Sequence, residues 1–147
     1  MTAVTETLLY MASRAQLVEE VVSLKLKAGK IVLCDRWLDA TVAYQGYGAG
    51  VDAQWIAMLG KVATYGLTPV LSIFLDLPLE CGLRRAKKRH AADRIEKKSL
   101  EFHQRVRKGY LAIAQSDPKR FKRIQIYETD SITQTHEKIK RLVDRVI

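Results

Sequence analysis

Three short predicted strands, separated by stretches of helical periodicity, constrain the fold of this 147-residue chain more than any other feature. Residues 31–34 and 70–77 have the length and apolar character of buried strands, and a third strand over residues 124–128 carries Ile124 and Ile126. Buried strands that alternate with helices indicate an α/β domain with a parallel sheet. No repeat or linker interrupts the pattern, so we expect one domain over residues 1–147.

Residues that cap or stop helices predict where the first helices end. The first helix is expected over residues 5–28, because apolar residues keep helical spacing there and Gly29 follows as a C-cap. A second helix is expected to begin after an N-cap at Asp52 and to close at Gly66. The glycine-rich run at residues 45–50 is expected to form a loop between these two helices.

Three more helices are expected in the rest of the chain. One begins at Leu79, one covers the apolar residues between Leu100 and Leu111, and the last is capped by Asp130 or Ser131. The buried face of the last helix is expected to carry Ile132, Ile139, Leu142, Val143 and Val146.

Positive charge is concentrated in one segment of the chain. The formal net charge is +9, but residues 84–123 alone hold 15 Lys and Arg against four Asp and Glu, a net of +11. Such a segment attracts polyanions such as nucleic acid or nucleotide phosphates, although a solvated helix face is the alternative. The segment lacks the interleaved aromatic residues of single-strand binders, so nucleic acid is the weaker prediction.

Membrane, secretory and metal-site signatures are missing from the sequence. No apolar run approaches the roughly 18–20 residues of a membrane helix, and the N-terminus does not read as a signal peptide. Cys34 and Cys81 form no C-x-x-C pair, and the three histidines stand alone. We therefore expect a cytoplasmic protein with reduced thiols and no membrane partner.

Charged residues follow the predicted strands, at the edge where parallel sheets bind ligands. Asp35 and Arg36 follow the first strand, Asp76 ends the second, and residues 128–130 follow the third. An Asp at this edge can hold a hydrated Mg²⁺ ion, and an Arg can bind a phosphate with two hydrogen bonds. The alternative for the Asp35–Arg36 pair is a helix cap and a surface arginine.

Two other groups of residues suit a nucleotide. Arg85, Arg89 and Arg94, with two neighbouring lysines, would surround a phosphate if their segment folded over the site. Tyr10 and Arg14 lie one helical turn apart, so a ring and a guanidinium face the same way. This second pair could stack on a base and hydrogen-bond to it, or it could simply pack.

Together these segments resemble thymidylate kinase, the family that phosphorylates dTMP. Four stretches carry the resemblance: L-L-Y-M-A-S-R-A-Q-L-V-E-E (8–20), C-D-R-W-L-D-A-T-V-A-Y-Q-G-Y-G-A-G (34–50), F-L-D-L-P-L-E-C-G-L-R-R-A-K-K-R (74–89) and D-R-I-E-K-K-S-L-E-F-H-Q-R-V-R-K-G-Y (93–110). The resemblance implies a P-loop nucleoside-monophosphate-kinase fold, with a parallel sheet flanked by helices. It also implies conversion of dTMP to dTDP with ATP as co-substrate and Mg²⁺ as cofactor, and a homodimer formed through the first helix and its neighbours.

The resemblance assigns dTMP contacts to one set of positions. Tyr10 matches the aromatic residue that stacks on thymine, and Arg14 matches the arginine at the thymine edge. Thr41 and Gln45 match polar residues that read the base, and Tyr44 matches the tyrosine against the deoxyribose. Together with the D-R motif, these form the acceptor set: Tyr10, Arg14, Asp35, Arg36, Thr41, Tyr44 and Gln45.

The resemblance also assigns roles in phosphoryl transfer. Arg36 matches the arginine on the acceptor phosphate, and Asp35 the aspartate near the phosphates and the magnesium, which it would hold through water. Arg85 resembles the arginine that stacks on adenine, whereas Arg89 and Arg94 resemble catalytic lid arginines on the ATP phosphates. Arg85, Arg89 and Arg94 form the donor set, within a lid expected at about residues 84–98.

One departure from the family pattern is large. The sequence holds no G-x-x-x-x-G-K-[ST] phosphate loop, and its two Gly-Lys pairs, Gly29–Lys30 and Gly60–Lys61, lack the rest of that motif. The family's first strand, which would lie between the strands ending at Asp35 and Asp76, is missing as well. The chain is therefore expected to be the C-terminal part of a thymidylate kinase. A smaller departure is Trp37, where the family usually has Tyr or His.

Two functions remain open on the sequence. The first is a thymidylate kinase, of which this chain is one part. The second is a non-catalytic module that binds dTMP or another nucleotide, or a partner, without phosphoryl transfer.

Overall fold

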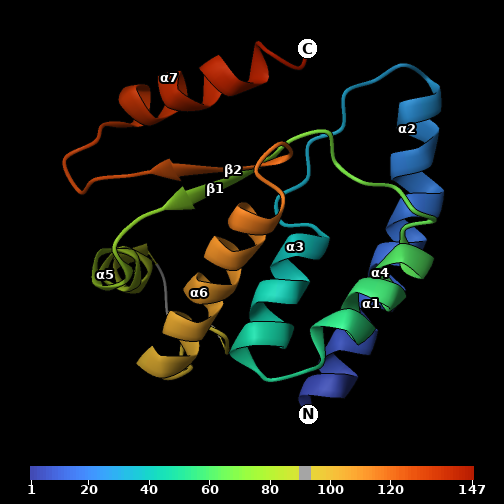
Figure 1. Cartoon of the computed structure of the whole chain (residues 1–147), viewed down its shortest axis with the longest axis horizontal. Helices are drawn as coiled ribbons and strands as arrows, with labels where there is room; N and C mark the ends of the chain where they lie inside the picture. Colours follow the sequence, from blue (N-terminus) through green and yellow to red (C-terminus); the bar gives the residue numbers. More distant parts are fainter. Residues whose placement is uncertain (90–93) are drawn as a thin grey trace. The chain divides into compact units, whose positions relative to one another are not determined.

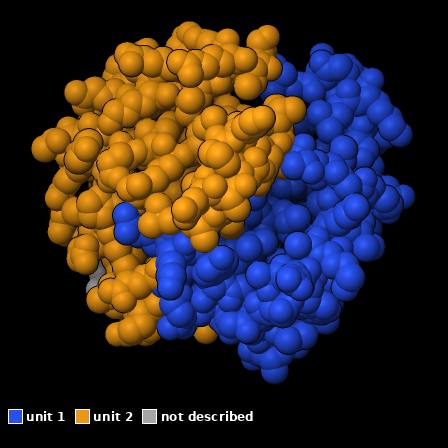
Figure 2. Space-filling model, viewed as in Figure 1, with its two compact units in different colours: residues 1–68, 105–110 blue, residues 69–104, 111–147 orange. Residues whose placement is uncertain are grey.

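A computed structural model describes residues 1–89 and 94–147 of the chain, the side chains of residues 86–89 excepted. The chain divides into two compact units, coloured separately in Figure 2. Unit 1 comprises residues 1–68 and 105–110, and unit 2 comprises residues 69–104 and 111–147. Residues 90–93 of the predicted lid lie outside the described part.

Unit 1 is helical. Its elements are α1 (Ala3–Leu17), the π-helix η1 (Val18–Val22), α2 (Ser23–Lys27), α3 (Leu38–Thr41), the π-helix η2 (Val42–Gly48) and α4 (Ala53–Ala63). α1, η1 and α2 follow one another without a break, which confirms the first predicted helix (Figure 1). Gly29, at φ 69°, ends this helix as predicted, and the Lys30 N–H donates to the Lys25 carbonyl in a Schellman-type closure.

The core of unit 1 lies between α1 and α4, around Met11, Ile56 and Ala63. α4 begins as predicted, with Asp52 Oδ1 accepting from the Trp55 N–H at 2.6 Å, but it ends at Ala63, three residues before the predicted Gly66, and Tyr65 takes the first left-handed conformation after it, φ 51°. The second Gly-Lys pair lies inside this helix, where a Cβ on Gly60 would stand 2.3 Å from Leu38 Cδ1. Close packing explains that glycine, as helix termination explains Gly29, and neither pair forms a phosphate loop.

The prediction of a loop at residues 45–50 was wrong for most of the run. η2 continues through Gly48, and only Gly50 takes a left-handed φ, 79°. Gly46 is buried in η2, where an added Cβ would lie 3.4 Å from Ile56 Cδ1. The packing of η2 against α4 therefore outweighs the low helix propensity of glycine at this position.

The predicted buried strand at residues 31–34 was also wrong. Within the described residues this segment is irregular and pairs with no strand, and Ile31 and Leu33 are 74% and 97% exposed. A strand is stabilised by hydrogen bonds to a neighbour, and no described segment supplies one here. The apolar pattern of a strand is present without the partner that would bury it.

Unit 2 contains a parallel pair of strands with helices, which confirms the α/β class. β1 (Ser72–Asp76) pairs in parallel with β2 (Phe121–Gln125), with Ser72 opposite Phe121 and Asp76 opposite Gln125 (Figure 1). β1 falls within the predicted 70–77, whereas β2 begins three residues before the predicted 124–128. The helices are α5 (Leu79–Arg89), α6 (Leu100–Ser116), of which residues 105–110 belong to unit 1, and α7 (Ile132–Val143).

α7 begins where the sequence predicts but buries less than expected. Ser131 is its N-cap and forms a capping box with Gln134. Ile132 and Val146 were predicted to be buried, yet they are 91% and 48% exposed. Ile132 is the first residue of the helix and Val146 follows its end. Ile139, Leu142 and Val143 are only half-buried, so α7 buries no residue fully.

Candidate functional site

The residues of the acceptor set all belong to unit 1. Tyr10 and Arg14 lie on α1, Asp35 and Arg36 lie in the segment between α2 and α3, and Thr41, Tyr44 and Gln45 lie on the continuous helix formed by α3 and η2. α1 contacts η2 directly. Residues from three parts of the sequence thus belong to one compact body.

Arg36 is held in an unusual conformation. Its backbone has φ 66°, in the left-handed region that residues with a Cβ seldom occupy. Its guanidinium carbon lies 5.1 Å from the centre of the Tyr44 ring. This cation–π contact leaves the hydrogen-bonding edge of the guanidinium available for an anion.

Arg14 also rests on an aromatic ring, that of Trp37. The distance from its guanidinium carbon to the ring centre is 5.5 Å, and Nη1 lies 3.4 Å from Met11 Sδ. Burial lowers the pKa of Arg14 from its ordinary value, with an opposing contribution from Cys34. Arginine stays charged at neutral pH even so, and Arg14 therefore provides a partly desolvated cation. Tyr10, one turn earlier on α1, is 43% exposed.

Thr41 and Gln45, the residues predicted to read the base, are each only 3% exposed. Gln45 Nε2 donates to Glu6 Oε1 at 2.7 Å. Glu6 was not predicted from the sequence, although its position one turn before Tyr10 on the same helix face was a usable signal. It fixes the Gln45 amide with the nitrogen toward α1.

Tyr110 is a second residue that the sequence analysis missed, because its spacing on α6 reads as core packing. Its ring meets the Tyr44 ring edge to face, with centroids 6.2 Å apart and an angle of 82° between the planes. Burial raises the pKa of the Tyr110 hydroxyl well above its ordinary value; Tyr44, Asp39 and Asp35 add to the shift, and Arg36 opposes it. A buried phenol thus lies within electrostatic reach of the Asp35–Arg36 pair.

The donor set belongs to unit 2. Arg85 Nη2 donates to the Glu128 carbonyl oxygen at 3.2 Å, while Arg84 forms an ion pair with the Glu128 carboxylate. The hydrogen bond from Arg84 is the main cause of a lowered pKa at Glu128. Arg89 is the last residue of α5, but its side chain lies outside the description, and Arg94 is exposed in a turn.

The carboxylates at the strand ends differ in their partners. Asp76 is fully buried and accepts from Arg123 Nε at 2.8 Å, and Asp130 pairs with Lys138 at 2.6 Å. Asp35 is exposed, and no described residue forms an ion pair with it. Of these carboxylates, Asp35 is therefore the one available to an external cation.

The described residues contain no group of three or more His, Cys, Asp or Glu side chains that could enclose a metal. Mg²⁺ commonly keeps most of its waters and is held by one or two carboxylates and substrate phosphates. A single exposed Asp35 fits that mode of binding. None of the described helices is long and apolar enough to cross a membrane.

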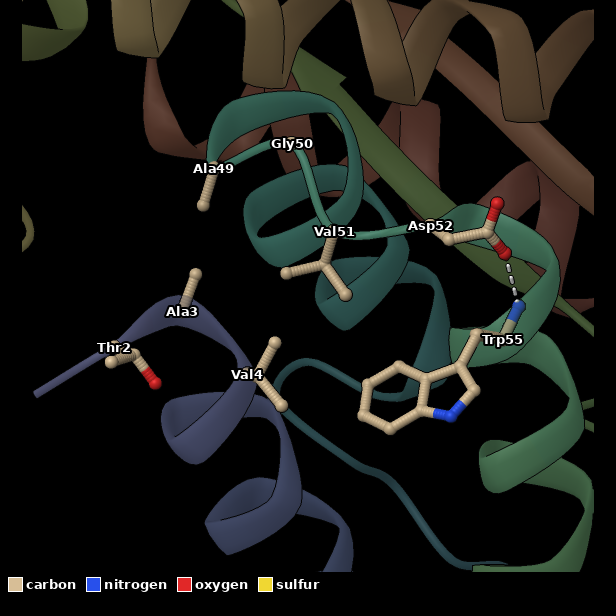
Figure 3. Close-up of a pocket in the computed structure, with 8 residues that line it drawn as sticks. All are labelled: Thr2, Ala3, Val4, Ala49, Gly50, Val51, Asp52 and Trp55. Carbon is tan, nitrogen blue, oxygen red and sulfur yellow. Dashed lines mark hydrogen bonds between the residues drawn. The ribbon is translucent and has the colours of Figure 1, made fainter.

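A groove of about 470 Å³ lies elsewhere in unit 1, between the start of α1 and the turn before α4 (Figure 3). Its walls are mostly apolar, and the carboxylate of Asp52 is occupied in capping α4. It is lined by Thr2, Ala3, Val4, Ala49, Gly50, Val51, Asp52 and Trp55. No residue of the acceptor set lines it.

Comparisons with known proteins all point to the same family. The family model described as thymidylate kinase matches residues 1–139. A thymidylate kinase of Kosmotoga olearia is 47% identical over 135 residues, which are 92% of this chain and 64% of that protein. One of Geotalea uraniireducens is 51% identical over 127 residues, 82% of this chain and 60% of that protein. The chain therefore spans less than two-thirds of the length of these relatives.

A solved structure agrees with the sequence comparisons. The crystal structure of thymidylate kinase from Ehrlichia chaffeensis superposes with a TM-score of 0.77 at 27% identity, covering 97% of this chain and 67% of that one. The predicted family and fold class are thereby confirmed. The chain belongs to the thymidylate kinase family.

Proposed function

We propose that this chain is part of an enzyme that transfers the γ-phosphoryl group of ATP to dTMP. A phosphate oxygen of dTMP would attack the γ-phosphorus while the bond to the bridging oxygen of ADP breaks, giving dTDP and ADP. The observation that carries the proposal is the Arg36 guanidinium held over Tyr44 beside an exposed Asp35. This arrangement suits an acceptor phosphate and its magnesium counter-ion.

On the acceptor side, each residue would have a separate role. Arg36 would bind the dTMP phosphate, and Arg14 the edge of thymine. Tyr10 would stack on the base, and Tyr44 would lie against the deoxyribose. Gln45, oriented by Glu6, would complete base recognition together with Thr41.

On the donor side, positive charge would be the main contribution. Arg85 would stack on adenine, and Arg89 and Arg94 would neutralise the charge that develops on the transferred phosphoryl oxygens. The lid at about residues 84–98 would carry them. Asp35 would hold Mg²⁺ through water, and the ion would neutralise phosphate charge when bound.

A second candidate is a non-catalytic module that binds dTMP alone. It is favoured by one observation: every residue of the acceptor set belongs to unit 1. The two candidates share dTMP binding and differ in phosphoryl transfer.

We further propose that the protein forms a homodimer in the cytoplasm. α1, α2, α4 and the turn after α4 expose apolar side chains that an interface would cover. These are Leu8, Leu9, Leu17, Leu24, Met58, Val62 and Tyr65. Both cysteines are free thiols, which fits a reducing compartment.

Formation of dTDP from ATP, Mg²⁺ and dTMP by the purified chain tests the first candidate, with Arg36→Ala as the control. Activity that the control abolishes would support the kinase. Without activity, saturable dTMP binding that Arg36→Ala weakens would favour the binding module. If the chain neither forms dTDP nor binds dTMP, the binding module is excluded and the chain holds no acceptor site on its own. Sedimentation of the same sample tests the dimer, which a monomer at micromolar concentration would contradict.

A further inference from the structure

We propose that Tyr110 is a positioning residue of the acceptor site. Its ring would hold Tyr44 in place, and Tyr44 in turn would hold Arg36 where a phosphate binds. The inference rests on the proposed role of Arg36, and it adds to the site a residue from a distant part of the sequence.

Residues 105–110 of α6 pack closely against η2. Arg105 donates from Nε and Nη2 to the Gly48 carbonyl oxygen at 3.1 and 2.8 Å. Gly109 approaches so closely that an added Cβ would lie 2.8 Å from the Tyr47 ring. With the Tyr110–Tyr44 contact, one side of α6 meets η2 at three successive points.

η2 depends on contacts from outside the helix, such as those from α6. A π-helix is a rare and poorly stable backbone form, and runs of more than one turn are unusual, yet η2 spans seven residues. It also contains Gly46 and Gly48, which are unfavourable inside a helix. The Gly48 carbonyl lies in the last turn, where intrahelical donors run out, and Arg105 satisfies it. External contacts therefore hold the helix that carries Tyr44.

Two successive ring contacts connect Tyr110 to Arg36. Tyr110 meets the Tyr44 ring edge to face, and Arg36 lies on that same ring. Because Arg36 leaves the backbone from a left-handed conformation, the ring gives its long side chain a defined resting place. The raised pKa of Tyr110 agrees with a buried hydroxyl close to these groups. Without the Tyr110 ring, the Tyr44 side chain would be free to rotate, and the Arg36 guanidinium would lose its cation–π contact with Tyr44.

The test compares the affinities of the chain for dTMP and for thymidine, which lacks the phosphate. Tyr110→Ala should weaken dTMP about tenfold more than it weakens thymidine, because both ligands lose some contact with Tyr44 at the deoxyribose but only dTMP loses the positioned Arg36 at its phosphate. Tyr110→Phe keeps the ring and should bind both ligands like the wild type. In an Arg36→Ala background, Tyr110→Ala should weaken dTMP no more than it weakens thymidine.

Equal weakening of both ligands by Tyr110→Ala would show a merely structural role and overturn the proposal. If Tyr110→Ala does not fold, Tyr110→Leu takes its place, and failure of both to fold would count against positioning as well. Should the wild type bind neither ligand, the proposed function fails, and a ligand-free measurement then decides on Tyr110. The NMR signal of Arg36 Nε–H should carry a ring-current shift that Tyr110→Ala removes and Tyr110→Phe keeps. An unchanged signal in Tyr110→Ala would reject the role.

Discussion

The two units hold their arginines in different ways. In unit 1, Arg14 and Arg36 lie on aromatic rings, whereas in unit 2, Arg84 and Arg85 are bound to the carboxylate and the carbonyl of Glu128. A ring supports a guanidinium from its face and leaves its N–H edge for a ligand. A carboxylate occupies that same edge, so a phosphate must first displace it. We therefore expect Arg36 to be ready for an anion in advance, whereas Arg84 would have to leave the Glu128 carboxylate to bind one.

The largest expected effect is at the acceptor phosphate. Arg36→Ala should lower dTMP affinity by about 100-fold, since it removes a charge-assisted, two-pronged hydrogen bond to phosphate. Isothermal titration with dTMP measures this, and Arg141→Ala on α7, which removes the same charge from an exposed position, is the matched control. Similar losses in the two variants would mean that general charge, and not a preformed seat, attracts the ligand.

A second change separates the stability of unit 2 from binding by unit 1. Asp76→Ala removes a fully buried carboxylate that pairs with the half-exposed Arg123. The free energy of unfolding should fall by roughly 2 kcal/mol, less than for a wholly buried pair. Urea denaturation measures the loss, and Asp144→Ala, whose ion pair with Lys140 is exposed, should cost far less. A loss of dTMP affinity in folded Asp76→Ala would show that the two units are not independent in this respect.

The second ring-supported arginine provides a sharper test of unit 1. Trp37→Leu removes the ring beneath Arg14 and should weaken dTMP by about tenfold, and thymidine to the same degree, because Arg14 is proposed to contact the base. Trp37→Phe should restore most of the affinity. If only dTMP is weakened, Arg14 acts on the phosphate and its proposed role is wrong.

The smallest effect is expected at Glu128 in unit 2. Its pKa lies below the ordinary value of 4.5, mainly because Arg84 donates to it. A lowered pKa in the folded state adds stability above pH 4.5, and this contribution is lost as the pH falls through the folded-state value. Glu128→Gln should therefore lose less stability than the wild type as the pH falls from 7 to about 3, as followed by thermal melts. It should also release Arg84 from its ion pair, whereas Arg85 stays bound to the backbone carbonyl of residue 128. If the variant and the wild type lose stability equally over this pH range, the exposed Arg84–Glu128 ion pair is too well screened by solvent to contribute.

Features set by local chemistry could be predicted from the sequence. Gly29, Asp52 and Ser131 end or begin helices through their own backbone or side chains, so each was predicted where it occurs. The acceptor set came from the family resemblance, and the structure shows that its members belong to one unit.

The rest depends on contacts between distant residues. Residues 31–34 have the pattern of a strand, but the described chain supplies no neighbour to pair with them. Gly46 has the sequence context of a loop residue until its burial in η2 against Ile56 is known. Tyr110 could not be predicted to meet Tyr44, because nothing in the spacing of α6 shows which helix it faces.

The central claim is that unit 1 presents an acceptor site formed in advance of ATP. Titration of the wild-type chain with dTMP and with thymidine, both without ATP and Mg²⁺, tests it most directly. We expect saturable binding of dTMP, at least about tenfold tighter than that of thymidine, because Arg36 is already positioned to bind the phosphate. Equal affinity for the two ligands, or no binding of dTMP until ATP is added, would contradict it.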